Sequence, residues 1–242
     1  MLVAGAAIYG VSGSDVFGFE RLEIAPVRYT DEADLASILA IEPGTNLFEV
    51  RTEPLAERLR QLPTVLDARV EVSLPDTLIV HVTEREPILI WRIGDAGHLV
   101  DPNGRLFALA EDAPGDAAAE LPSIVDDRAA STLGLATGST LDPIDFEAAR
   151  RIVALTPADV GSVAQAFGVT VTDANGFVLS TRPGSWVAVF GFYTPTLRTP
   201  ELVPGQVRLL RSLLAEREAE IARIILASDE DGTYIPIPTP KP

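Results

Sequence analysis

Two neighbouring carboxylates, Glu84 and Glu86, are the first residues of this 242-residue chain that could carry out catalysis. They stand two positions apart on a segment that reads as extended, so both side chains would share one face. Paired carboxylates hydrolyse glycosidic bonds when they lie roughly 5 to 9 Å apart across a bound sugar, normally inside a cleft. A solvated strand end is the simpler interpretation, because exposed charges of this kind are common.

The other candidate ligands and motifs also lack the pattern that their chemistry needs. His81 and His98 are the only histidines, and neither has the neighbours of a zinc motif, so we interpret His81 as a surface residue. Asp229-Glu230-Asp231-Gly232 lacks the alternating ligands and the distant glutamate of a calcium loop, and it reads as a hairpin turn. P-loop, GxGxxG and GxSxG motifs are absent. We therefore expect no catalytic residue, metal, cofactor or small-molecule substrate.

Composition favours a folded globular protein and disfavours nucleic-acid binding. Hydrophobic residues make up 47% of the chain and charged residues 22%, which argues against global disorder. The formal net charge is −16, from 35 acidic and 19 basic residues, and Lys241 is the only lysine. Nucleic-acid binding needs clustered lysine and arginine, so we expect no nucleic-acid partner. The absence of cysteine excludes disulfides and thiolate metal sites.

The first residues form a short apolar segment. Residues 1–11 carry no charge, and residues 12–15 are polar or small. A membrane-spanning helix needs about 20 apolar residues, so this run is about half of one. A buried strand or helix turn is the alternative. We interpret the run as the outer half of a transmembrane helix, with the rest of the chain outside the cytoplasm.

Residues 19–83 show the pattern of a small two-layer α+β unit. A short strand at residues 19–25 precedes a helix that Thr30 could cap and that Glu42-Pro43-Gly44 would end. A second helix begins near Thr52. Two strands follow, joined by the turn Leu74-Pro75-Asp76-Thr77. Their alternation places one set of side chains on the helix-facing side: Ala68, Val70, Val72, Leu74, Leu78, Val80 and Val82. The predicted order is β-α-α-β-β.

Four stretches in this unit resemble an FtsQ-type POTRA domain, in the same order. They are Ile41-Glu42-Pro43-Gly44-Thr45-Asn46-Leu47-Phe48, Leu62-Pro63-Thr64-Val65-Leu66-Asp67-Ala68-Arg69-Val70, Leu74-Pro75-Asp76-Thr77-Leu78 and Val82-Thr83-Glu84-Arg85-Glu86-Pro87. The chain departs from the family at residues 25–29, where a Gly-Asn turn is often found. The resemblance implies the FtsQ/DivIB family of cell division proteins.

The remainder of the chain reads as a β-rich domain with a few helices. Strands are expected at residues 88–93, 98–100, 163–172, 177–181, 186–190, 221–227 and 234–237, and residues 121–124 re-enter regular structure. Residues 111–120 read as a loop, a helix ends near Thr156, and another helix covers residues 204–220. Trp91, Val100-Asp101 and Gly104 resemble the start of the FtsQ β-domain. We expect a helix remnant and linker at 1–17, the POTRA domain at 18–86, the β-domain at 87–238 and a tail at 239–242.

The resemblance implies a membrane-anchored scaffold of the division septum. Its partners would be divisome membrane proteins of the FtsB/DivIC and FtsL type, and through them the septal peptidoglycan synthase. The last strands would offer an open sheet edge to a partner strand. The residues predicted to bind a partner are Ile224, Ile225, Leu226, Thr233, Tyr234 and Ile235. Two alternatives remain: a POTRA-bearing module of protein export and an extracytoplasmic hydrolase.

Overall fold

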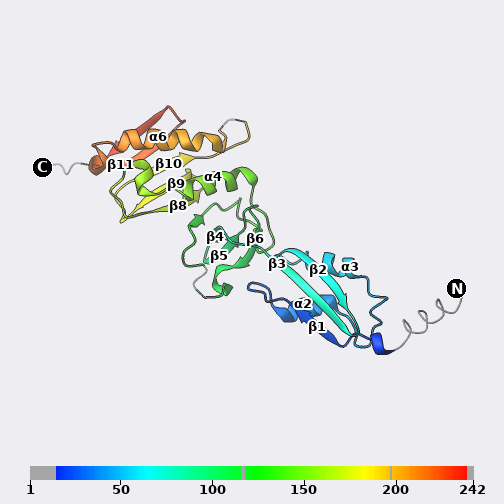
Figure 1. The fold of residues 1–242 in the computed structure, drawn as a ribbon. Coiled ribbons are helices and arrows are strands. Elements are labelled where there is room, and N and C mark those ends of the chain that lie inside the picture. Colours follow the sequence, from blue (N-terminus) through cyan, green and yellow to red (C-terminus); the bar gives the residue numbers. More distant parts are fainter. Residues whose placement is uncertain (1–14, 116–117, 197, 239–242) are drawn as a thin grey trace. The chain divides into compact units, whose positions relative to one another are not determined.

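The computed structural model describes residues 15–115, 118–196 and 198–238, which form two compact units (Figure 1). The division falls between Glu86 and Pro87, and the first unit also includes Asp112–Pro114. Each unit has a hydrophobic core of its own. The apolar run that we interpret as part of a transmembrane helix, residues 1–11, and the tail 239–242 lie outside the described residues.

The first unit has the predicted order β-α-α-β-β. After the 3-10 helix η1 (Asp15–Phe17) come β1 (Arg21–Ile24), α2 (Glu32–Leu39), α3 (Thr52–Leu59), β2 (Val65–Ser73) and β3 (Thr77–Glu84). The strands form a sheet in the order β1-β3-β2, in which β1 runs parallel to β3 and β2 runs antiparallel to it. The α+β class that the alternating strands and amphipathic helices predict is confirmed.

The core of this unit lies between the sheet and its two helices. Leu35 and Leu39 of α2 and Leu55 and Leu59 of α3 are buried against strand residues such as Val80. Burial of such side chains contributes about 1.5–3 kcal/mol each relative to exposure.

The buried face of β2 ends earlier than alternation predicts. Val70 is 6% exposed, whereas Val72 is 36% and Leu74 is 50% exposed. The prediction that these last two residues face the core is therefore wrong.

Both ends of α2 differ from the prediction. Asp31, not Thr30, caps the helix, because its carboxylate accepts a hydrogen bond from the Ala33 N–H at 2.7 Å. The hydroxyl of Thr30 instead donates to Glu84 at 2.7 Å. The helix ends at Leu39, before the predicted Pro43 stop, because Ala40 adopts a left-handed conformation with φ 46°.

The second unit is built on one nine-stranded sheet. Its strands are β4 (Leu89–Ile93), β5 (Ala96–Val100), β6 (Leu106–Leu109), β7 (Ser123–Asp126), β8 (Ala166–Thr172), β9 (Gly176–Arg182), β10 (Val187–Gly191), β11 (Ile221–Leu226) and β12 (Gly232–Pro236). Its helices are α4 (Pro143–Val153), α5 (Pro157–Val160) and α6 (Val203–Leu214), with 3-10 turns η2 (Ala110–Asp112), η3 (Pro200–Leu202) and η4 (Glu218–Glu220). The expected β-rich domain with few helices is confirmed.

The strand order is β12-β11-β10-β9-β8-β7-β4-β5-β6. Helix α4 connects the parallel strands β7 and β8, and α6 connects the parallel strands β10 and β11. Figure 1 shows both helices on the same side of the sheet, and their apolar residues share its core with Trp91 and Trp186.

Two helix predictions in this unit need correction. The helix expected to reach Glu220 ends at Leu214, because Glu216 has φ 62° and the chain turns before η4. The short helix α5 was not predicted.

Candidate interaction site

Strand β12 forms one edge of the nine-stranded sheet. It pairs antiparallel with β11, and within residues 15–238 no other described strand lies beyond it. All five residues of β12 are exposed. The unpaired backbone groups of such an edge can accept a further strand from another chain.

The direction of each backbone group of β12 follows from one hydrogen bond. The N–H of Ile237 donates to the carbonyl of Glu220 at 2.8 Å, so it points toward the β11 side. Backbone direction alternates along an antiparallel strand, so Ile235 and Thr233 also face β11, whereas Tyr234 and Pro236 face outward. Since proline has no N–H, Tyr234 supplies the central outward donor of this edge.

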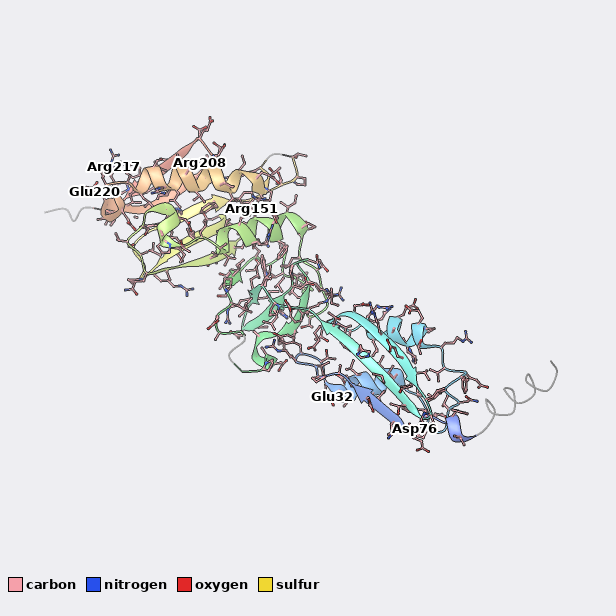
Figure 2. The ribbon with its side chains drawn as sticks, in the orientation of Figure 1. Glu32, Asp76, Arg151, Arg208, Arg217 and Glu220 are labelled. Atoms are coloured by element: carbon pink, nitrogen blue, oxygen red, sulfur yellow. The ribbon has the colours of Figure 1, made fainter. Side chains whose placement is uncertain are left out.

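Two residues after α6 help to hold β12 in place. Figure 2 shows Arg217 and Glu220 at the end of α6. The guanidinium of Arg217 donates to the hydroxyl of Tyr234 at 3.5 Å, and the carbonyl of Glu220 accepts from Ile237. Ile235, on the other face of β12, is 49% exposed. The edge therefore combines an ordered backbone with apolar side chains that remain accessible.

The six residues predicted to bind a partner occupy two different environments. Thr233, Tyr234 and Ile235 lie on the exposed edge strand. Ile224 and Leu226 are 0% and 1% exposed, so their side chains belong to the core and cannot contact a partner directly. Ile225 is partly buried on β11.

A buried polar network anchors β11 to α6. Gln206 is fully buried; its amide donates to the carbonyls of Phe190 and Leu226 at 3.1 and 3.3 Å and accepts from the Tyr193 hydroxyl at 2.7 Å. Burial raises the pKa of the Tyr193 hydroxyl above its ordinary value. The network fixes the strand that β12 pairs with.

A hollow of about 440 Å³ lies on the same unit, lined by residues that include Val189, Phe192, Arg198, Arg223 and Ile225. The Nε atoms of both arginines are buried without a hydrogen-bond partner among the described residues. The Nη2 of Arg223 donates to Asn175, and that of Arg198 to the carbonyl of Leu226. The sequence reasoning missed this site, although an arginine within the apolar strand Ile221–Leu226 was a signal for it.

A buried ion-pair cluster in the second unit has the residue types of an active site, but its charged groups bind one another. Asp126 is buried and accepts from Arg128, at 2.7 Å, and from the indole of Trp91, at 3.2 Å. Arg128 also donates to Asp145 at 2.6 Å. Burial opposes the charge of Arg128, but its two carboxylate partners raise its pKa overall. The cluster ties β7 to α4 and is structural.

The carboxylate Glu84, considered above for hydrolysis, anchors a loop. Its oxygens accept from the backbone N–H groups of Arg28 and Tyr29, at 2.5 and 2.9 Å, and from the hydroxyl of Thr30. Glu84 does end strand β3, but its carboxylate is partly buried by these contacts and is not simply solvated, while Glu86 is exposed.

The remaining candidates for metal binding lie apart. His81 is exposed, whereas burial lowers the pKa of His98. Asp231 closes a turn in which its carbonyl accepts from the Ser228 N–H at 3.0 Å. Over the described part of the chain, no three histidine, aspartate or glutamate side chains gather as metal ligands would. In the same residues no helix has the length and apolar character to cross a membrane.

The chain is similar to known proteins both in its first unit and over most of its length. The family model "POTRA domain, FtsQ-type" matches residues 17–85. The chain is similar to "Cell division protein FtsQ" of Syntrophotalea carbinolica, with 28% identity over 96% of this chain and 82% of that protein. The protein of the same name from Chloroflexus aurantiacus is 24% identical over 95% of this chain and 74% of its own length. With that of Mycobacteroides abscessus the match is 28% identical but spans only 46% of the relative.

Proposed function

Since this chain belongs to the FtsQ/DivIB family of cell division proteins, we propose that it is a non-enzymatic scaffold that binds other divisome proteins through the edge strand β12. The partners would be membrane proteins of the FtsB/DivIC and FtsL type, which would connect it to septal peptidoglycan synthesis. The observation that carries the proposal is an exposed, ordered strand with an outward backbone donor at Tyr234.

Main-chain pairing explains why this site can be selective without a pocket. A partner strand would gain its affinity from hydrogen bonds to outward groups and its specificity from contacts with alternate side chains. Pro236 lacks a donor at the next outward position, which limits how far pairing can extend. The buried Ile224 and Leu226 would contribute by keeping β11 rigid.

Backbone direction determines the variant that tests this proposal. Ile235→Pro would remove a donor directed at β11 and so disturb the fold itself. Tyr234→Pro removes the outward donor and leaves the pairing with β11 intact. Tyr234→Ala is the matched control, because it truncates the same side chain but keeps the N–H.

The experiment is a pull-down of a coexpressed FtsB/DivIC-like partner by the wild type and both variants, with folding checked by circular dichroism. Tyr234→Ala should weaken binding only modestly, and Tyr234→Pro should reduce it by about tenfold or more, the effect of roughly 1.4 kcal/mol. If folded Tyr234→Pro captures the partner as well as wild type does, β12 is not the docking edge.

We also propose that the protein is anchored in the cell membrane at the septum, with the two units outside the cytoplasm. The support is the uncharged apolar run at residues 1–11, together with the family to which the chain belongs. When cells that express the natural gene product are fractionated, the protein should be recovered with the membranes. It should stay there during a high-salt wash. Recovery in the soluble fraction would contradict the anchor.

A further inference from the structure

The first unit also has an open sheet edge, and it is the longer one. Strand β2 covers nine residues and lies at the end of the order β1-β3-β2. Among the residues that the structure describes, no strand pairs with its outer side. Long edges of this kind are potential sites of pairing with another chain, and proteins usually protect them.

Two hydrogen bonds define which groups of β2 face outward. The N–H of Arg85 donates to the carbonyl of Thr64 at 2.9 Å, and the N–H of Ala25 donates to the carbonyl of Val80 at 3.0 Å. Residues of β3 with odd numbers therefore face β2, and those with even numbers face β1. The register pairs Arg69 with His81, so the outward residues of β2 are Ala68, Val70 and Val72.

An arginine from the end of α3 occupies part of this edge. The Nη2 of Arg60 donates to the outward carbonyl of Ala68 at 2.9 Å, and its Nε donates to the carboxylate of Asp67 at 2.9 Å. The same carboxylate oxygen accepts the outward N–H of Ala68 at 2.9 Å. Glu53 holds the guanidinium from the other side, at 2.8 Å. Side chains thus satisfy both outward groups of Ala68.

The sequence of the edge is self-complementary around Val70. If two copies of β2 pair antiparallel with Val70 opposite Val70, each Arg69 lies opposite Glu71 of the other copy. These positions form the closely spaced type of pair, where opposite charges are favourable. The same register places Ala68 opposite Val72 and requires the backbone groups that Arg60 and Asp67 now occupy.

Exposed apolar residues along β2 also favour pairing of this edge with another strand. Leu66, Val72 and Leu74 are all at least one-third exposed, although each lies in or next to this strand. Pairing around Val70 would bring Val72 of each copy into the extended sheet. Such residues on an edge are otherwise an aggregation risk.

We propose that the outer edge of β2 is a self-association surface for a second copy of this chain, and that Arg60 holds it closed. While the guanidinium remains on Ala68, the register with two Arg69–Glu71 pairs cannot form. Release of Arg60 frees the carbonyl of Ala68 and removes the cation that holds the Asp67 carboxylate over the Ala68 N–H. No repacking of the core is needed, since the Arg60 side chain is 33% exposed. This surface is distinct from β12, so the proposal does not depend on the docking of a partner there.

Sedimentation velocity of the 242-residue chain tests this proposal. Arg60→Met retains the apolar stem but removes the donors, and should raise the affinity for dimer formation by about tenfold or more over wild type. Arg51→Met is the matched control, because it removes an exposed arginine at the start of the same helix and should leave the mass at 25.8 kDa. Arg60→Gln serves as the second variant if circular dichroism shows that Arg60→Met does not fold.

Charge reversal then identifies the register. In the Arg60→Met background, Glu71→Arg places like charges opposite each other and should abolish the dimer. Adding Arg69→Glu restores opposite charges and should restore it. A folded Arg60→Met that stays monomeric overturns the proposal, and so does a dimer that is indifferent to both charge reversals.

Discussion

The partly buried carboxylate of Glu218 holds several segments of the second unit together. Its oxygens accept from the Ser162 hydroxyl at 2.5 Å, from the Trp186 indole at 2.8 Å and from the Val163 N–H at 3.0 Å. Burial alone would raise the pKa of Glu218, but these three donors together lower it below its usual value. Its ionised form therefore stabilises the fold.

A pH dependence follows from that shift. A carboxyl whose pKa is lower in the folded state contributes its full stability above the unfolded value, about 4.3, and loses it as pH falls through the folded pKa. Glu218→Gln should lower the free energy of unfolding at neutral pH by roughly 1–2 kcal/mol. The difference from wild type should narrow below about pH 4, as measured by urea unfolding.

The control for this prediction is Glu220→Gln, which neutralises a nearby exposed carboxylate. That variant should keep the unfolding free energy within about 0.5 kcal/mol of wild type at both pH values. If the unfolding free energy of Glu218→Gln stays below that of wild type by the same amount at every acid pH, the carboxylate charge contributes nothing to stability.

At the residue level, sequence reasoning succeeded where the signal was local. Alternation correctly placed Val70 and Val80 in the core. It could not show that Glu84 would bind residues 28–30, since those partners are more than 50 positions away in the sequence. Asp31 and Thr30 are both good helix caps, and only the long-range bond to Glu84 removes Thr30 from that role.

At the level of elements, the C-terminal end of α6 shows what limits prediction. Val207, Leu210, Leu213 and Leu214 have helical spacing, and the hydrophilic residues after them also favour a helix. The chain nevertheless turns at Glu216, where Trp186 and Ser162 bind Glu218 and direct the chain into β11. Such tertiary contacts override local propensity, and sequence periodicity does not contain them.

The start of α6 is constrained by close packing against the turn that joins β11 to β12. A Cβ at Gly205 would lie 2.3 Å from the Cβ of Asp229, in the turn that joins β11 to β12. A glycine within a helix ordinarily costs about 1 kcal/mol relative to alanine. Here it permits the helix to approach the turn from which the edge strand begins, so α6 and β12 are fixed to each other.

At the scale of the whole molecule, the α+β class and the order of elements in the first unit could be predicted, but the topology of the large sheet could not. Hairpins such as β8–β9 carry a local turn signal at residues 173–176. The parallel pairs β4–β7 and β7–β8 join segments separated by loops and by α4, and no residue pattern specifies them.

The two separate cores make a prediction about the unfolding of the whole chain. Val70 is buried among residues of the first unit alone, and Val70→Asp would place an unpaired carboxylate there. This change should cost about 4 kcal/mol or more and unfold that unit, whereas the neighbouring exposed Glu71→Lys should change its stability by less than about 0.5 kcal/mol. The core of the second unit contains none of these residues, so its unfolding should be unaffected.

Differential scanning calorimetry of the 242-residue chain distinguishes these outcomes. Val70→Asp should remove the transition of the first unit and leave the transition of the second at its wild-type temperature, because domains with their own cores unfold as separate units. Glu71→Lys should retain both transitions. Equal destabilisation by the two substitutions would contradict the register of β2, and loss of both transitions in Val70→Asp would show that the second unit needs the first in order to fold.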